Sequence, residues 1–228
     1  MAKTALVVMA RNPEEGKVKT RLAVTIGTSE TLRIYKAFLS DLAQRFAGWQ
    51  EEAYTMYWAY TPSEADFALN VTALVPSARA SRYFAQCGPD LGSSLRHAFH
   101  TTAAFGFQQT ILIGSDAPQL GREMITQACQ ALEGADVVLG PAEDGGYYLI
   151  AMRKPYDLFS KIPMSTPQVL QMTMERAHRL GLSVHLLEPL FDIDELPELL
   201  RLKALLTVQP ELAPLSAAVI CSLSGGLL

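Results

Sequence analysis

The sequence predicts a single-domain α/β fold, in which a mostly parallel sheet lies between two layers of helices. Two observations carry this prediction. Short apolar runs alternate with amphipathic segments along the chain, and the first run is apolar at successive positions, as in strands buried on both faces. The composition agrees, because 49% of the 228 residues are hydrophobic and only 18% are charged, which indicates a large buried core.

Runs of β-branched and aliphatic residues mark the predicted strands. The first covers residues 4–10, and the clearest is the TILIG run at residues 110–114. The other predicted strands are residues 53–60, 71–75, 136–140, 147–152 and 183–187.

Amphipathic segments between these runs predict the helices. Residues 29–48 place Tyr35 and several leucines on one stripe and end at Gly48. Thr61 and Glu64 form a capping box around Pro62, so a short helix is expected to begin there. Further helices are predicted at residues 91–105, 121–133, 166–181 and 195–206.

Charge and cysteine content exclude several classes of protein. A net charge of −4 argues against general nucleic-acid binding, which needs a broad basic field. The three cysteines are isolated in the sequence, so neither a disulfide framework nor a zinc site is expected, and a reduced cytoplasm is the simplest compartment. No apolar stretch reaches the roughly 20 residues that span a bilayer. Residues 1–210 are expected to form the domain, followed by an apolar tail at residues 211–228 that would suit a homodimer interface.

Three cations follow the first predicted strand. Lys17, Lys19 and Arg21 occupy alternate positions just after Gly16. Such a cluster can be an ordinary solvated loop, or its side chains can converge on phosphate oxygens. Its position favours an anion site, because ligands of parallel α/β sheets bind outside the carboxyl ends of the strands.

Acidic residues follow two other predicted strands. Asp116 comes directly after TILIG, where it can form a turn, bind Mg²⁺ or Mn²⁺, or do both. Asp192 and Asp194 follow the strand at residues 183–187 and, in extended chain, point the same way. The alternative for Asp194 is to cap the helix that follows it.

A third acidic site lies in the sequence PAEDGGYY. Asp144, Gly145 and Gly146 would fit a plain hairpin turn between two strands equally well. Read as a functional site, Asp144 is a candidate general base or a residue that orients an acceptor hydroxyl.

Six ordered motifs resemble a known bacterial family. They are AR-x5-KVKTRL, DLGSSLRHAF, LIGSDAPQL, DVVLGPAEDGGYYLIAM, IPMSTPQVL and FDID, and together they span residues 4–205. They are similar to the small transferases of the nucleotide-diphospho-sugar transferase superfamily, which have a GT-A fold and are often described as glycosyltransferases, including some associated with arsenosugar biosynthesis. Distant relatives are the guanylyltransferases of molybdenum-cofactor and phospholactate metabolism.

The resemblance implies a role for each matched residue. The donor phosphates would be held by Arg11, Lys17, Lys19 and Arg21. The nucleoside would lie along residues 90–94, which include Gly92 and Ser93. The metal ligands would be Asp116, which is also catalytic, and Asp194, with Asp192 as a helper. The acceptor side would be formed by catalytic Asp144 with Gly145 and Gly146.

The sequence departs from the family at two positions. Ser115 stands where a second acid would precede Asp116, and Glu195-Leu196-Pro197 replaces the usual Thr-Pro after the last acidic motif.

Three functions follow from these observations. The first is metal-dependent group transfer from a nucleotide-activated donor, a nucleotide-sugar above all, to a small acceptor. The second is nucleotidyl transfer, in which an NTP reacts with a phosphorylated acceptor and releases pyrophosphate. The third is nucleotide binding without catalysis.

Overall fold

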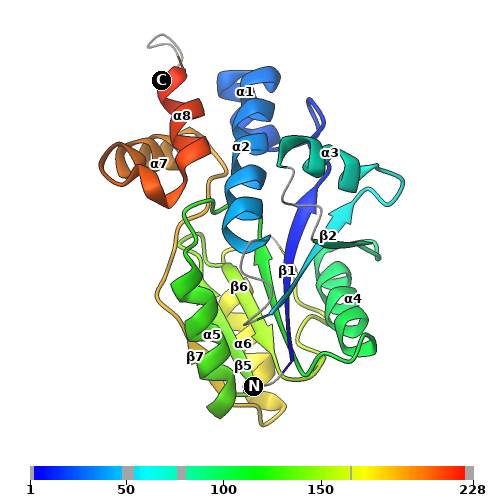
Figure 1. Cartoon of the computed structure of the whole chain (residues 1–228). Helices are drawn as coiled ribbons and strands as arrows, with labels where there is room; N and C mark the ends of the chain where they lie inside the picture. Colours follow the sequence, from blue (N-terminus) through cyan, green and yellow to red (C-terminus); the bar gives the residue numbers. More distant parts are fainter. Residues whose placement is uncertain (1–2, 48–53, 76–80, 165, 224–228) are drawn as a thin grey trace.

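The computed structural model describes residues 3–47, 54–75, 81–164 and 166–223. Within these ranges one seven-stranded sheet has the order β3-β2-β1-β4-β6-β5-β7 (Figure 1). The strands are β1 Thr4–Arg11, β2 Thr55–Thr61, β3 Arg82–Ala85, β4 Gln109–Gly114, β5 Val137–Pro141, β6 Tyr147–Met152 and β7 Val184–Leu186. Neighbouring strands are parallel except where β6 pairs with β4 and β5. The predicted mostly parallel sheet is confirmed.

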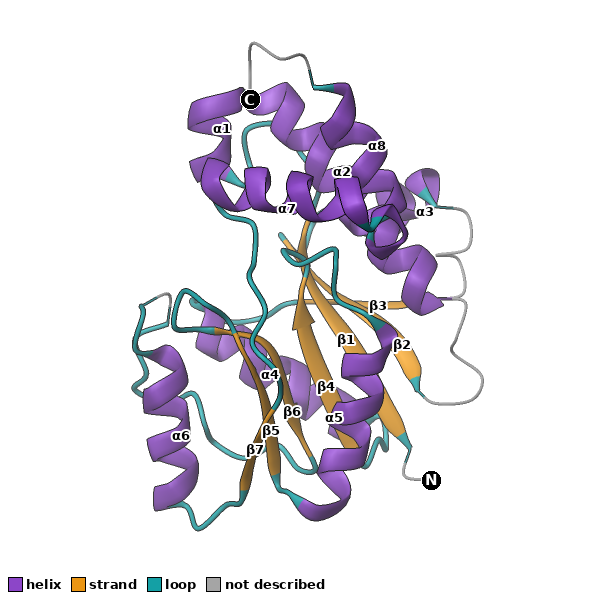
Figure 2. Ribbon diagram, turned by 90° about the vertical axis from the view of Figure 1, so that its left-hand side faces the viewer, coloured by secondary structure: helices purple, strands orange, loops and turns teal. Residues whose placement is uncertain are grey.

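Helices cover both faces of this sheet and give the predicted three layers (Figure 2). One face packs against α2 Thr28–Ala47, α3 Phe67–Leu74 and α5 Arg122–Gly134. The other face packs against α4 Leu91–Ala104 and α6 Val169–Arg179. At one end of the molecule lie α1 Thr20–Ile26, α7 Leu196–Val208, the 3₁₀ helix η2 Pro210–Leu212 and α8 Pro214–Ser222. No helix in the described ranges is long and apolar enough to cross a membrane.

Strand β1 lies at the centre of the fold and is buried on both faces. Leu6 and Val8 belong to the core on the α2 side, whereas Ala5 and Val7 belong to the core on the α4 side. β1 pairs with β2 on one edge and with β4 on the other, so the strand order reverses between β1 and β4. In open α/β sheets ligands bind outside the carboxyl ends of the strands at such a point.

The predicted helix start at residues 61–64 is wrong. Thr61 is the last residue of β2 and pairs with Arg11 of β1. Its carbonyl also accepts a 2.8 Å hydrogen bond from the Asn12 amide. Because this residue is held in the sheet, it cannot cap a helix, and α3 begins only at Phe67.

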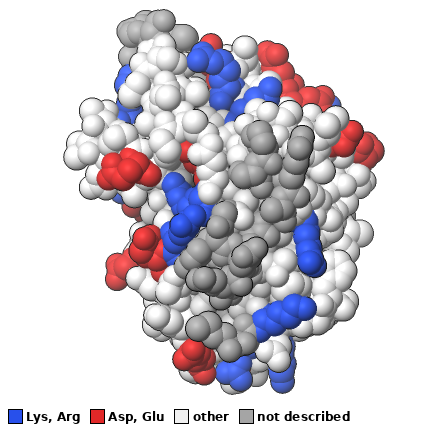
Figure 3. All heavy atoms as spheres, in the orientation of Figure 1, with Lys and Arg blue, Asp and Glu red and all other residues white. Residues whose placement is uncertain are grey.

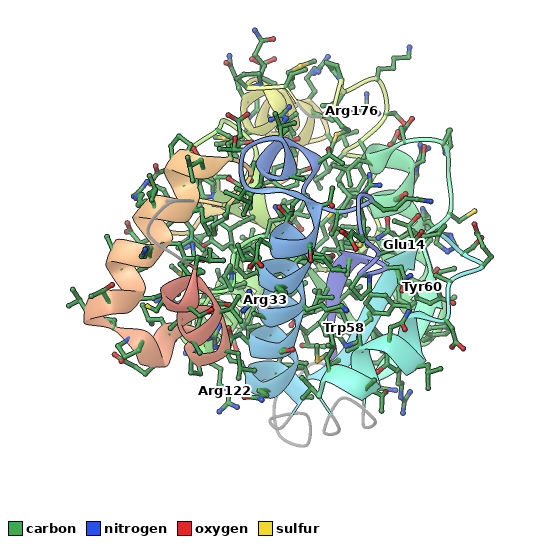
Figure 4. All side chains as sticks on the ribbon, turned by 90° about the horizontal axis from the view of Figure 1, so that it is seen from above. Glu14, Arg33, Trp58, Tyr60, Arg122 and Arg176 are labelled. Atoms are coloured by element: carbon green, nitrogen blue, oxygen red, sulfur yellow. The ribbon has the colours of Figure 1, made fainter. Side chains whose placement is uncertain are left out.

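The predicted strand at residues 71–75 is also wrong, because most of that segment belongs to α3. A short apolar run fits a strand and a buried helix equally well. Phe67 and Val71, one helical turn apart, are fully buried. The Phe67 ring lies 5.3 Å from Tyr60 and 5.6 Å from Trp58, two β2 residues labelled in Figure 4. At this edge of the sheet the third strand is β3, which the sequence analysis missed.

The segment predicted as a basic loop contains a helix. Lys17 and Lys19 do lie in a loop, but α1 begins at Thr20 and includes Arg21. Leu22 and Ile26 are its buried residues, and a helix of seven residues is too short to reveal a helical period. The remaining predicted elements are all present, with ends shifted by three residues at most where those ends lie in the described ranges; the predicted ends at residues 48 and 53 lie outside them.

A buried carboxylate attaches helix α8 to α2. Asp41 of α2 is only 2% exposed. It accepts hydrogen bonds from the amides of Leu215 at 3.0 Å and Ser216 at 2.8 Å, and from the Ser216 hydroxyl at 2.5 Å. First-turn amides have no partner within their own helix, so Asp41 acts as a cap supplied by another helix. The separation of residues 211–228 from residues 1–210 stays a prediction.

We expect Asp41→Ala to lower the free energy of unfolding by about 2–4 kcal/mol, because it leaves buried donors of α8 without an acceptor. Urea unfolding measures this as a lower midpoint with an unchanged slope. Asp66→Ala is the matched control, because Asp66 is an exposed N-cap residue whose side chain makes no capping hydrogen bond. The control should change stability by less than about 0.5 kcal/mol. Equal effects of the two substitutions would contradict this account of α8.

Candidate functional site

A cleft of about 880 Å³ opens at the carboxyl ends of β1 and β4. Its walls come from the loop between β1 and α1, the start of α4, the turn after β4, the β5–β6 turn and the segment before α7. All four predicted cations and all four predicted aspartates line it. The topology thus brings together residues that lie up to 183 positions apart in the sequence, from Arg11 to Asp194.

Three of the four cations, Arg11, Lys17 and Arg21, are exposed. Arg11 is exposed at the end of β1, and its backbone is held by Tyr35, whose hydroxyl lies 3.0 Å from the Arg11 amide and 3.1 Å from its carbonyl. Lys17 is 70% exposed, and its ammonium lies 3.4 Å from Glu14. Arg21 is 68% exposed and lies 4.0 Å from Asp194. On the face drawn in Figure 3, basic and acidic side chains are interspersed.

Lys19 differs from the other three because it is buried between two carboxylates. Its side chain is 6% exposed, and its Nζ lies 2.6 Å from Asp116 Oδ1 and 2.9 Å from Asp194 Oδ1. Burial lowers the pKa of this ammonium, but the two carboxylates outweigh burial, so the pKa is raised above its ordinary value. Lys19 therefore carries a fixed positive charge in the wall of the cleft.

Asp192 and Asp194 lie in a loop in which cleft-lining and buried residues alternate. Ile193 is fully buried, whereas the aspartates on either side of it are half-buried and line the cleft. The Ile193 amide donates a 3.0 Å hydrogen bond to the carbonyl of Asp116, which joins this loop to the turn after β4. Asp194 is not a helix cap. Glu195 is the N-cap of α7, and its amide donates to the Glu198 carboxylate.

Two positioning residues were missed by the sequence analysis. Gln119 is buried, and its Nε2 donates a 2.6 Å hydrogen bond to the Phe191 carbonyl, which reinforces the contact between the two acidic segments. The Tyr35 hydroxyl lies 3.2 Å from the hydroxyl of Ser115, the residue before Asp116. Burial, with the nearby Asp116 charge, raises the pKa of Tyr35 to about 12. The apolar stripe of α2 identified Tyr35 only as a core residue.

Asp144 lies in the turn between the antiparallel strands β5 and β6. It is exposed, lines the cleft, and its Oδ1 accepts a 2.8 Å hydrogen bond from the Gly146 amide. Gly145 has φ 90°, and a Cβ there would meet the Pro167 carbonyl oxygen at 2.1 Å. Glycine at this position therefore lets the turn pack against the segment before α6.

The start of α4 forms the opposite wall. Leu91 and Ser94 line the cleft, whereas Gly92 is buried, and a Cβ there would meet Met164 at 3.3 Å. The Ser93 amide donates a 2.7 Å hydrogen bond to Asp90, the N-cap of this helix. This bond lowers the pKa of the Asp90 carboxyl.

The acidic residues suit a hard divalent cation in their chemistry. Mg²⁺ and Mn²⁺ prefer oxygen ligands, and Asp116 and Asp194 bring one carboxylate oxygen each to within 3 Å of the same point. That point is the position of Lys19 Nζ. No group of three or more acidic, histidine or cysteine side chains in the described ranges could hold a metal by itself. Oxygens of a ligand would have to complete the coordination shell.

Asp192 shows that negative charge at this site is incompletely balanced. Burial raises the pKa of its carboxyl, and the charges of Asp144 and Asp194 raise it further, to about 6. Lys19 lowers this pKa, but only as the smallest contribution. The Asp192 carboxyl therefore ionises less readily in the folded protein than in the unfolded chain.

We expect the free energy of unfolding of Asp192→Asn, minus that of wild type, to increase as pH rises from about 4 to 7, with both proteins free of metal. A raised carboxyl pKa stabilises the folded state below the unfolded pKa of 3.8, and this contribution is lost as pH rises through about 6. Chemical unfolding at pH 4, 5, 6 and 7 measures the difference. Glu211→Gln, an exposed acid on η2, is the control. A pH-independent difference between Asp192→Asn and wild type would refute the assignment.

Comparison with known proteins identifies the family of the chain. Residues 41–166 match the model of a family described as "Uncharacterized protein conserved in bacteria (DUF2064)". A crystal structure from Desulfovibrio desulfuricans G20, described as a "putative nucleotide-diphospho-sugar transferase", is 30% identical, and the match covers 97% of this chain and 95% of that one with a TM-score of 0.85. No curated protein sequence matches the chain significantly.

More distant structures share the fold alone. One is glucosyl-3-phosphoglycerate synthase from Mycobacterium tuberculosis, in complex with Mn²⁺, UDP and glucosyl-3-phosphoglycerate. It has a TM-score of 0.55 and 13% identity over 93% of this chain and 80% of that one. Another is 4-diphosphocytidyl-2C-methyl-D-erythritol synthase from Anaerococcus prevotii, with a TM-score of 0.59 and 10% identity over 90% and 96%. The chain belongs to the DUF2064 family and has the fold of the nucleotide-diphospho-sugar transferases.

Proposed function

We propose that this transferase moves a glycosyl group from a nucleotide-diphospho-sugar to a small acceptor, with Mg²⁺ or Mn²⁺ as cofactor. The family and the fold support a nucleotide-activated donor. A relative of the same fold contains Mn²⁺ together with UDP, which supports a divalent cation beside the nucleotide.

The observation that carries the proposal is the balance of charge in the cleft. Five aspartates, at positions 90, 116, 144, 192 and 194, line it against four cations, and among the described residues Lys19 and the exposed Arg21 are the cations paired with these aspartates. A diphosphate that entered alone would meet unbalanced carboxylates, of which Asp192 already has a raised pKa. A donor that arrives with a divalent cation would neutralise this charge instead.

Each predicted site residue has a place in this proposal. Asp116 and Asp194 would hold the cation, with Asp192 beside them, and the bound cation would stabilise charge on the leaving diphosphate. The exposed side chains of Arg11, Lys17 and Arg21 would bind the donor phosphates. The nucleoside would lie along the start of α4, at Gly92, Ser93 and their neighbours.

Asp144 would act on the acceptor. It is exposed in the cleft at the β5–β6 turn, and its Oδ1 accepts a hydrogen bond from the Gly146 amide, while its Oδ2 accepts none from the described residues. A free carboxylate oxygen can orient an acceptor hydroxyl and take its proton as the glycosyl bond forms. Gly145 and Gly146 would shape this acceptor side.

The distribution of cations favours an acceptor without phosphate. The lysines and arginines among the cleft-lining residues all come from residues 11–21. The acceptor side carries Asp144, Tyr147 and Thr166, with no lysine or arginine among its described lining residues. A phosphorylated acceptor would lack a partner there and would be repelled by Asp144 and Asp192, whereas an uncharged or cationic alcohol would not.

Nucleotidyl transfer is the second candidate. It is supported by the exposure of Arg11, Lys17 and Arg21, three cations that would suit a triphosphate, and by the fold shared with 4-diphosphocytidyl-2C-methyl-D-erythritol synthase and with a cytidylyltransferase from Leptospira borgpetersenii. Its product is pyrophosphate, whereas glycosyl transfer releases a nucleoside diphosphate.

A thermal-shift panel of NTPs and nucleotide-diphospho-sugars, each with and without Mn²⁺, tests the proposal. We expect one sugar nucleotide with Mn²⁺ to raise Tm by several degrees, because a ligand at 100 times its Kd stabilises by about 2.7 kcal/mol. Incubation of that donor with alcohol acceptors should then release a nucleoside diphosphate.

Variants give this experiment its controls. Asp116→Asn should abolish the Mn²⁺-dependent part of the shift, whereas Asp66→Asn, an exposed acid outside the cleft, should leave it intact. Stabilisation only by an NTP, followed by pyrophosphate release with a phosphorylated acceptor, would replace glycosyl with nucleotidyl transfer. A Mn²⁺-dependent shift that survives in Asp116→Asn would refute the metal assignment.

A further inference from the structure

Lys19 occupies the point that its two aspartate neighbours offer to a cation. Its Nζ is 2.6 Å from Asp116 Oδ1 and 2.9 Å from Asp194 Oδ1, and its side chain is 6% exposed. The preceding lysine, Lys17, is 70% exposed and pairs with Glu14. We propose that Lys19 competes with the divalent cation for Asp116 and Asp194, and that it leaves these carboxylates when the cation and the donor bind. This inference rests on the proposed function, because it takes both aspartates as metal ligands.

Distances make joint occupancy unfavourable. Mg²⁺ and Mn²⁺ bind carboxylate oxygens at about 2.0–2.2 Å, so an ion on both Oδ1 atoms would lie within about 5 Å of Nζ in its present position. An ammonium and a divalent cation at that separation repel each other. The ammonium also uses one oxygen of each carboxylate that the ion would need.

The backbone holds Lys19 in this position. Its φ of 45° and ψ of 48° are left-handed, a conformation that residues with a side chain seldom adopt. The neighbouring Val18 is 2% exposed, and the Lys19 carbonyl accepts a 2.9 Å hydrogen bond from the Ala23 amide, which starts α1. The backbone of Lys19 is therefore anchored on both sides. If the ammonium leaves Asp116 and Asp194, the side chain moves while the backbone stays in place.

A new partner for the ammonium exists within the same cleft. Lys19 lines the space that the donor would occupy, and its flexible four-carbon stem lets the charge move without the backbone. Donor phosphates would accept the released ammonium, while the cation takes the carboxylates. Cation and donor should therefore bind with positive cooperativity, each raising the affinity for the other by the same factor.

Mn²⁺ binding to the nucleotide-free protein, measured from the EPR signal of free Mn²⁺, tests the competition. We expect Lys19→Met to bind Mn²⁺ at least tenfold more tightly than wild type. Lys17→Met removes the same charge from the same loop at an exposed position, so it should bind like wild type. Adding Asp116→Asn to Lys19→Met should remove the gain. An affinity of Lys19→Met equal to or below that of wild type would overturn the inference.

A second measurement uses the unmutated protein and holds even where Lys19→Met does not fold. Acetylation of native protein with a lysine-reactive ester, followed by mass spectrometry, reports the accessibility of each lysine. At Mn²⁺ concentrations that EPR shows to saturate the protein, acetylation of Lys19 should rise at least threefold relative to Lys17. An unchanged ratio at saturation would overturn the inference.

The same titrations separate this inference from the proposed function. If Mn²⁺ binds neither the wild-type protein nor Lys19→Met, with or without UDP or GDP, the proposed use of a metal fails. The proposed exchange of Lys19 for the cation then fails with it. If Mn²⁺ binds wild type and Lys19→Met equally tightly, and Asp116→Asn weakens binding, the metal assignment stands. Only the proposed exchange of Lys19 for the cation is then refuted.

Discussion

The ion pairs of Lys19 with Asp116 and Asp194 are the interaction on which the site depends. They connect the loop after β1, the turn after β4 and the segment before α7, three parts of the chain that meet only in the folded protein. Without the buried ammonium, two carboxylates would face each other at the sheet edge without an internal counterion. Burial makes such pairs costly to break, because the partner left behind keeps an uncompensated charge. The Lys19 ammonium therefore holds three segments of the cleft wall together.

Backbone contacts below this pair keep the two acidic segments in register. The Ile193 amide bonds to the Asp116 carbonyl, and Gln119 bonds to the Phe191 carbonyl. On the other side, the Tyr35 hydroxyl bridges the end of β1 and Ser115 at the end of β4. These neutral hydrogen bonds position the carboxylates without adding charge. The carboxylates of the proposed cation site are thus held by contacts on both sides.

Much of the fold was predictable because buried strands and helices have recognisable patterns of apolar residues. Strands buried on both faces are continuous apolar runs, and the TILIG run became β4. The failures came where two structures share one pattern, as with residues 71–75, or where an element is too short for its period to show, as with α1 and β3. Ligands of parallel α/β sheets bind outside the carboxyl ends of the strands, and this rule predicted that Lys19, Asp116 and Asp194 lie at one edge of the sheet. Which of them would touch could not be predicted, because side-chain pairing depends on tertiary distances, and for the same reason Tyr35 and Gln119 were missed.

The most direct test of this account is a crystal structure of the protein with Mn²⁺ and UDP, using anomalous scattering to locate the metal. The account predicts a manganese peak bound by Asp116, Asp194 and diphosphate oxygens, with the Lys19 ammonium moved from the carboxylates to a phosphate. A structure in which Lys19 still joins the two aspartates, while manganese and UDP lie elsewhere or bind without these residues, would contradict it.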